Sequence, residues 1–180
     1  MSLPTLRTER LVLRPFDATD AAAVQRLAGD RQVASTTLTI PHPYEDGIAE
    51  AWIEPHAARW AEKKALTLAV ATEADGLVGA IGLSLKLEHL RAEIGYWIGV
   101  PFWNHGYATE AAKALIEFGF DELGLNRIEA HHFTRNPASG RVMEKLGMTL
   151  EGVRRQHVLK SDELEDLALY AVLGSDRNRG

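Results

Sequence analysis

Residues 91–100 alternate between apolar and polar or small positions, and the spacing changes after them. The alternating apolar residues indicate one face of a β-strand: Ile94, Tyr96, Ile98 and Val100. From Ala108 onward the apolar residues recur three and four positions apart, as on one buried face of a helix: Ala112, Leu115, Ile116, Phe120 and Leu123. The pattern therefore predicts a strand, a tight turn at residues 101–106 and a helix.

The same patterns predict strands and helices along the rest of the chain. Apolar or alternating stretches predict strands at residues 10–14, 66–71, 77–85, 127–134, 148–159 and 163–172. Helical spacing predicts helices at about residues 17–28, 45–63 and 137–146, the last with Asn136 as its N-cap. Residues 1–174 are expected to form a single domain, and residues 175–180 a polar, frayed tail.

Composition narrows the class of protein. The chain has 180 residues, 46% hydrophobic and 25% charged, which is enough for one domain with a sizeable core. Its net charge is −5 and it has no basic stripe, which argues against binding to nucleic acid or anionic membranes. It has no cysteine, so no disulfide or thiolate nucleophile is available. Because no apolar run approaches a membrane span and no signal peptide is recognisable, we expect a soluble, cytoplasmic protein.

The turn before the central helix suits a phosphate. A helix N-terminus presents unpaired backbone N–H groups and the positive end of its dipole. Gly106 and Ala108 are small, which leaves room for a bulky anion to approach the main chain. The alternative is an ordinary strand–turn–helix connection, and the chain carries neither of the two standard glycine-rich phosphate loops.

Two segments resemble one family of enzymes. WNHGYA at residues 103–108 resembles the pyrophosphate loop of the GNAT acetyltransferases, Q/R-x-x-G-x-G/A, although Trp103 departs from its first position. With the preceding EIGYWIG, this text is similar to the ribosomal-protein N-acetyltransferase-like group of that family. Residues 136–148 resemble its N-x-x-S-x-x-x-x-E-K-x-G-F/M segment. The resemblance implies the GNAT form of an α/β (α+β) fold: a mixed, mostly antiparallel twisted sheet with helices on both faces.

The resemblance also implies a site for acetyl-CoA. Main-chain groups of the turn would bind its pyrophosphate, at His105, Gly106, Tyr107, Ala108 and Thr109. The parallel strands 91–100 and 127–134 would splay apart, so that the main chain at Ile98 and Gly99 bonds the pantetheine arm and steadies the carbonyl oxygen. Asn136 would bond the cofactor, and Ser139 would protonate the departing thiolate. Without the family, Asn136 is an ordinary helix cap and Ser139 an exposed first-turn residue.

On the acceptor side, the resemblance places residues 40–63 at the edge of the cleft. Tyr44, Trp52 and Trp60 then either line the cleft or belong to the core, where large rings at helical spacing usually lie. Glu93, on the central strand, is either paired with an arginine or acts as a base through water, as in some relatives.

The base is uncertain because Val158 stands where relatives carry a glutamate, beside His157. His157 is therefore a second candidate. Metal chemistry is not expected: no H-E-x-x-H motif occurs, and the adjacent His131 and His132 should point to opposite faces of a strand.

The sequence therefore predicts an acetyl-CoA-dependent N-acetyltransferase. With no cysteine to carry the acetyl group, the amine attacks the thioester directly in a ternary complex. The acceptor predicted first is a protein or peptide N-terminal α-amine, such as that of a ribosomal protein. Two alternatives stay open: a small amine acceptor (an antibiotic or a polyamine), and a non-catalytic acyl-CoA-binding module. The resemblance further implies a homodimer.

Overall fold

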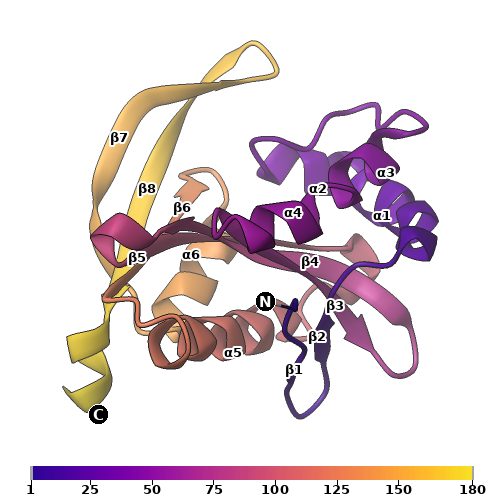
Figure 1. The fold of residues 1–180 in the computed structure, drawn as a ribbon. Coiled ribbons are helices and arrows are strands. Elements are labelled where there is room, and N and C mark those ends of the chain that lie inside the picture. Colours follow the sequence, from indigo (N-terminus) through magenta and orange to yellow (C-terminus); the bar gives the residue numbers. More distant parts are fainter. Residues whose placement is uncertain (1, 180) are drawn as a thin grey trace.

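The computed structural model describes residues 2–179, which build one eight-stranded mixed sheet with helices on both faces (Figure 1). The strands are β1 Leu6–Arg7, β2 Val12–Arg14, β3 Ala65–Thr72, β4 Gly76–Lys86, β5 Arg91–Ile98, β6 Arg127–Phe133, β7 Thr149–Lys160 and β8 Glu163–Leu173. They lie in the order β1-β2-β3-β4-β5-β6-β8-β7. Within the described chain β5 and β6 pair in parallel and all other neighbours are antiparallel, which confirms the predicted class of sheet.

The helices form two layers. In Figure 1, α1 to α4 lie above the sheet and α5 and α6 below it, while the β7–β8 hairpin extends beyond the upper layer. Their bounds are α1 Ala21–Ala28, α2 Arg31–Thr36, α3 Ile48–Ile53, α4 His56–Ala61, α5 Tyr107–Asp121 and α6 Pro137–Lys145. Short 3-10 helices cover Ala18–Asp20, Leu87–His89, Val100–Phe102 and Gly174–Arg179. None of the described helices combines the length and apolar character needed to cross a bilayer.

The upper layer differs from the prediction in two places. The single helix expected at residues 45–63 is two helices, because Pro55 has no N–H to donate to the preceding turn. The helix α2 was not predicted. It begins where the Asp30 carboxylate accepts the Gln32 N–H, at a distance of 2.8 Å.

Both ends of the chain carry secondary structure that the sequence did not predict. The strand predicted at 10–14 begins at Val12 and pairs with the unpredicted strand β1. The tail expected to fray forms a 3-10 helix over Gly174–Arg179, where Arg177 pairs with Asp121 of α5 and lies over the Phe120 ring. Contacts of Arg177 therefore join the tail to α5.

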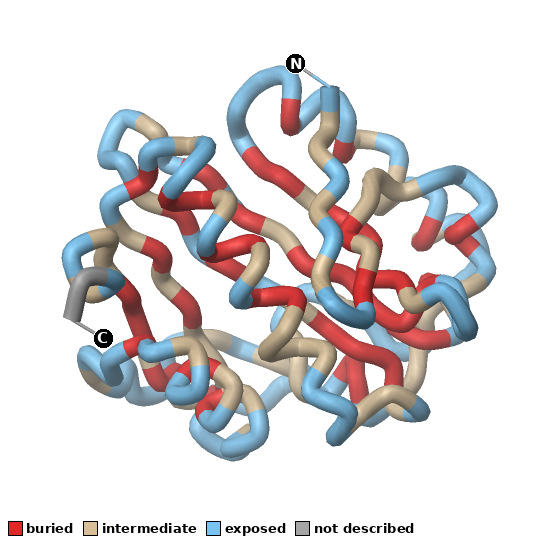
Figure 2. The backbone as a smooth tube through the Cα atoms, turned by 90° about the horizontal axis from the view of Figure 1, so that it is seen from below, coloured by how far each residue is buried: buried red, intermediate tan, exposed pale blue. Residues whose placement is uncertain are grey.

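The central strand β5 separates two hydrophobic clusters, as its alternation predicts. Ile94 and Ile98 pack into the larger cluster with Leu115 of α5, and Trp97 packs into the smaller one with Leu27 of α1. Figure 2 shows the buried residues concentrated along the central strands. Burial on both faces fixes the register of β5, since a slip of one residue would turn each side chain to the other face.

Candidate active site

The parallel strands β5 and β6 share only a short paired segment. Arg91, Ala92 and Glu93 pair with residues 127–129, and no β5–β6 pair follows in the described chain. β5 meanwhile continues to pair with β4 as far as Ile98. The two strands thus separate after Glu93, as the resemblance implied, and open a gap beside the second half of β5.

Pairing with β4 decides which main-chain groups of β5 face that gap. The Gly99 N–H donates to the Val78 carbonyl oxygen of β4 at 2.9 Å. Because successive residues of a strand present their polar groups to opposite sides, Tyr96 and Ile98 present theirs away from β4. The Ile98 carbonyl oxygen accepts the indole N–H of Trp103 at 2.6 Å. The N–H groups of Tyr96 and Ile98 are then the donors directed toward the gap.

Gly99 does not have the free main chain that we expected. Its N–H is bonded to Val78, and its carbonyl oxygen accepts the Phe102 N–H at 2.9 Å. The predicted role of its main chain toward a carbonyl oxygen is therefore wrong. Gly99 packs closely against α1, since a Cβ here would lie 2.7 Å from Cδ2 of Leu27 and this side chain would have to shift.

The turn before α5 has the geometry of an anion site. Gly106 takes a φ of 81°, and α5 begins at the next residue without a side-chain cap. The first helical hydrogen bond here runs from the Glu110 N–H to the Gly106 carbonyl oxygen at 3.0 Å. The N–H groups of Tyr107, Ala108 and Thr109 therefore have no partner inside the helix, and the positive end of the helix dipole lies with them.

Arg10, which the sequence analysis did not identify, holds this turn. Its guanidinium donates to the His105 carbonyl oxygen at 2.9 Å and to the Glu110 carboxylate at 2.7 Å, and lies 5.0 Å above the Tyr107 ring. Burial raises the pKa of Glu110, but hydrogen bonds from Thr8 and Arg10 together outweigh burial and lower that pKa. Glu110 therefore remains ionised and anchors Arg10 against the turn.

Asn136 and Ser139 contact each other at the start of α6. Asn136 is the N-cap by position, but its side chain accepts no helical N–H and instead donates from Nδ2 to Ser139 Oγ at 3.1 Å. The alternative of an ordinary side-chain cap is therefore wrong. The contact leaves Asn136 Oδ1 and the Ser139 proton for another partner.

Buried polar atoms next to Ser139 lack partners within the described chain. The Tyr96 hydroxyl makes no hydrogen bond of standard geometry, and the same holds for His132 Nε2, which lies against Gly140. Burial raises the pKa of Tyr96 to about 12, opposed in smaller part by the nearby Ser139 hydroxyl. Because burying an unpaired polar atom costs free energy, this region is suited to a polar ligand.

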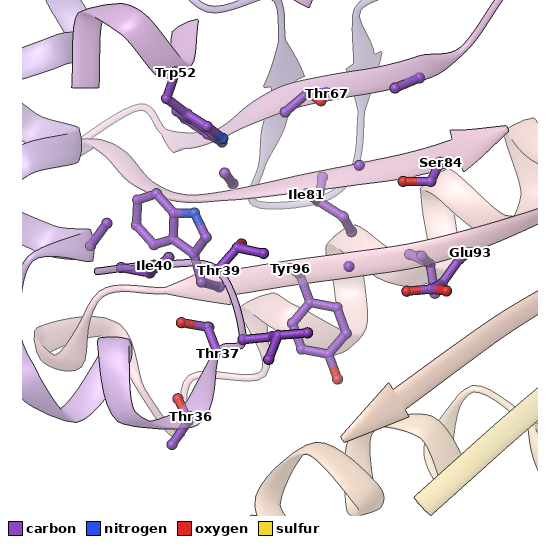
Figure 3. A pocket seen from close by; sticks show the side chains of 18 of the residues that line it. Thr36, Thr37, Thr39, Ile40, Trp52, Thr67, Ile81, Ser84, Glu93 and Tyr96 are labelled. Carbon is purple, nitrogen blue, oxygen red and sulfur yellow. The ribbon is translucent and has the colours of Figure 1, made fainter. Parts of the chain in front are cut away.

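A cleft of about 500 Å³ joins this region to the upper layer (Figure 3). Ser139 and Glu93 line it, together with Tyr44 and Trp52, the residues predicted to contact an acceptor. Trp60 does not line it: its side chain is 5% exposed, packs in the larger cluster and donates from its indole to the Ser2 carbonyl oxygen at 3.1 Å. The core alternative therefore holds for Trp60.

The two candidate bases lie in different places. Glu93 Oε1 is 3.2 Å from His131 Nδ1, so the carboxylate pairs with a histidine and not with the expected arginine. His157 does not line the large cleft. Its Nε2 lies 3.3 Å from Arg154 Nη1, beside a smaller cavity of about 340 Å³ that Val158 and Glu93 also line. Among the described residues, no group of three or more histidine or acidic side chains is placed to hold a metal.

Known proteins share this fold, and some share up to about a third of the aligned residues. Residues 10–149 match the acetyltransferase (GNAT) domain family. The uncharacterized N-acetyltransferase YoaA of Bacillus subtilis is 34% identical over 173 residues, covering 94% of this chain and 97% of that protein. The L-amino acid N-acetyltransferase AaaT of Escherichia coli is 25% identical over 159 residues, covering 87% and 93%. RimL, a ribosomal L7/L12 alpha-N-protein acetyltransferase solved with coenzyme A, has a TM-score of 0.87 at 17% identity, covering 94% and 98%.

Proposed function

Because the chain belongs to the GNAT acetyltransferases, which use acetyl-CoA, we propose that it acetylates the N-terminal α-amine of a protein or peptide. The observation that carries this choice of acceptor is the weakness of the available base. By resemblance, Val158 stands where the family group carries a glutamate that can serve as base. Where β5 and β6 separate, the Glu93 carboxylate oxygen Oε1 lies 3.2 Å from His131 Nδ1.

The residues around the gap fit acetyl-CoA. Three free N–H groups at the start of α5, at Tyr107, Ala108 and Thr109, would hold the pyrophosphate, next to exposed His105 and Gly106. The Tyr96 N–H would bond the pantetheine arm as a neighbouring strand does, and Asn136 would donate or accept at its far end. When bound, acetyl-CoA supplies a thioester whose carbonyl carbon accepts an amine.

In the reaction, a main-chain N–H group stabilises charge and a side chain donates a proton. The Ile98 N–H stabilises negative charge on the carbonyl oxygen, where a fixed donor is more effective than water. Ser139, held by Asn136, gives a proton to the sulfur. The chain has no cysteine, so the amine attacks the thioester directly.

The pKa of the amine decides how much help the protein must give. An α-amine has a pKa near ~8 and a lysine side chain near ~10.4. The difference of about two units corresponds to roughly 3 kcal/mol of deprotonation that a lysine acetyltransferase must supply. A site without a strong base therefore favours α-amines over lysine side chains.

A peptide with a free N-terminus and one internal lysine is accordingly expected to be acetylated on its N-terminus. Fragmentation mass spectrometry locates the acetyl group, and the same peptide with a blocked N-terminus is the control, which should react at least about tenfold more slowly. Acetyl groups found mainly on the lysine would contradict the choice of acceptor, while leaving the activity itself in place.

The relationship to AaaT favours a second candidate acceptor, a free L-amino acid, which also carries an α-amine. Rates of free-thiol release from acetyl-CoA with amino acids, peptides, polyamines and aminoglycosides distinguish the candidates. If no amine causes release of free thiol from acetyl-CoA, the protein binds acyl-CoA but does not catalyse acetyl transfer. We further propose that the acceptor protein is a ribosomal protein and that the enzyme works in the cytoplasm. We also propose that the enzyme is a homodimer whose subunits are each a single domain. Sedimentation velocity tests the dimer.

A further inference from the structure

We propose that His131 is the catalytic base that takes the proton of the acceptor amine, and that Glu93 is its positioning residue. The inference rests on the proposed function, because it concerns the same site. Glu93 belongs to the last pair that joins β5 to β6, and its partner there is Glu129. His131 lies two positions further along β6. Its side chain therefore meets Glu93 where the strands separate, with 3.2 Å between Nδ1 and Oε1.

The side chains of His131 and Glu93 are both accessible to solvent and both line the large cleft. The side chain of His131 is 29% exposed and that of Glu93 50%, and both line the large cleft that also contains Ser139. A carboxylate beside Nδ1 favours the tautomer with its proton on Nδ1, which leaves the lone pair on Nε2. No partner for Nε2 occurs among the described residues that form hydrogen bonds. In this arrangement His131 is the base, and the Glu93 carboxylate orients its ring.

The other histidines near the gap are less suited. His132 donates from Nδ1 to the Phe133 carbonyl oxygen, 2.7 Å away, and its Nε2 is buried against Gly140. His157 has its Nε2 lone pair directed at Arg154 and lies outside the large cleft. His131 is therefore the histidine in this part of the structure that combines an oriented ring with an available nitrogen.

The proposed step balances as follows. The acceptor enters as an ammonium group, and one of its protons passes to His131 Nε2 and then to solvent. The nitrogen lone pair forms a bond to the thioester carbonyl carbon, and the carbon–sulfur bond breaks with its electron pair on sulfur. The second N–H proton leaves the new amide to solvent, while sulfur takes its proton from Ser139, which solvent reprotonates.

Other charged groups near the pair must be considered before pH is used as a test. They lie on β5, β6, β7 and α4: Arg91, Arg127, Glu129, Glu151, Arg154, His157 and Arg59. Burial raises the pKa of Glu129, but hydrogen bonds from Arg127 and Arg91 outweigh it; a hydrogen bond from Arg127 lowers the pKa of Glu151. Both carboxylates therefore stay ionised near neutral pH. Besides His131, the neighbouring histidines His132 and His157 are the groups that an assay must separate.

The experiment compares kcat/KM of the wild type and His131→Gln across about pH 5 to 9, where imidazole groups titrate. Dividing the two profiles removes the titration of the amine, which both proteins share. We expect His131→Gln to lower kcat by about tenfold or more, with unchanged affinity for CoA, and to lose an acidic limb that the wild type shows. His89→Gln, on the exposed 3-10 helix before β5, is the matched control and should keep the wild-type profile.

A second measurement does not depend on turnover. In the free protein, the ¹⁵N spectrum of the His131 ring should show the Nδ1-protonated tautomer, and Glu93→Ala should shift the population toward the other one. Glu93→Gln keeps a hydrogen-bond acceptor and should retain more activity than Glu93→Ala. Added imidazole should partly restore His131→Gly.

The outcomes separate two kinds of failure. If the wild type releases no thiol with any amine, the proposed function is wrong and the base has no reaction to serve. If the wild type turns over and His131→Gln keeps its rate and acidic limb, His131 is not the base. Loss of the limb in His157→Gln or His132→Gln alone would assign the base to that histidine instead.

Discussion

Ser139→Ala is expected to slow acetyl transfer by about a hundredfold, which corresponds to roughly 2.7 kcal/mol in the activation free energy. The Ser139 hydroxyl accepts a hydrogen bond from Asn136 Nδ2 at 3.1 Å. Ser139 lines the same cleft as Glu93 and as Tyr44 and Trp52, the residues predicted to contact the acceptor. Removing it leaves water to protonate the sulfur, while the main-chain groups that would bind CoA are untouched. The rate constant should therefore fall with little change in CoA affinity.

The measurement is single-turnover acetyl transfer to a slow amine, so that chemistry and not product release limits the rate. Ser35→Ala is the matched control, because the Ser35 hydroxyl bonds only to the Gln32 carbonyl oxygen on the exposed side of α2. A Ser139→Ala protein that keeps the full single-turnover rate would exclude Ser139 as the acid.

Gly106→Val is expected to weaken CoA binding by about tenfold or more, with each tenfold worth about 1.4 kcal/mol. The φ of 81° is one that a β-branched residue adopts only with strain. A Cβ at this position would also lie 3.4 Å from Arg10 Nη2, so a branched side chain would stand beside the residue that holds the turn. Both effects displace the N–H groups at the start of α5.

Isothermal calorimetry with CoA measures the change. Gly124→Val is a matched control, since Gly124 has a φ of 64° after α5 and a Cβ there would meet no atom within 4 Å. It carries a similar backbone strain far from the turn, so it should lose stability but keep its affinity. Equal affinity in a folded Gly106→Val protein would remove the turn from the binding site.

The sequence was informative wherever structure depends on neighbours along the chain. Periodicity predicted β5, the turn and α5, because burial of one face repeats locally. The Asn136-Pro137 pair predicted where α6 begins, although the Asn136 side chain does not cap the helix. By contrast, the pairing of Glu93 with His131 depends on the parallel register of β5 and β6, which brings together residues far apart in the sequence. The same holds for Gly99, whose N–H direction follows from its pairing with β4.

The structure gives a physical reason for the tryptophan at position 103. The general GNAT pattern that the turn resembles has glutamine or arginine there, whereas a tryptophan is familiar in the ribosomal-protein N-acetyltransferase-like group that it also resembles. In the structure its Nε1 donates to the Ile98 carbonyl oxygen at 2.6 Å, which ties the turn to the end of β5. The side chain fixes the relative position of the two main-chain segments proposed to bind CoA.

The short pairing between β5 and β6 also divides the sheet into two parts, strands β1 to β5 and strands β6 to β8, that few main-chain pairs join. In the described chain, three residue pairs of the β5–β6 ladder join the strands β1 to β5 to the strands β6 to β8. The side-chain pairs Arg91–Glu129 and Glu93–His131 also cross from β5 to β6. A ligand that forms hydrogen bonds with both β5 and α6 would connect the two parts of the sheet across the boundary between β5 and β6. By linkage, a ligand at a hundred times its dissociation constant adds about 2.7 kcal/mol to the free energy of unfolding. The lifetime of the enzyme against proteases would then follow the CoA supply of the cell.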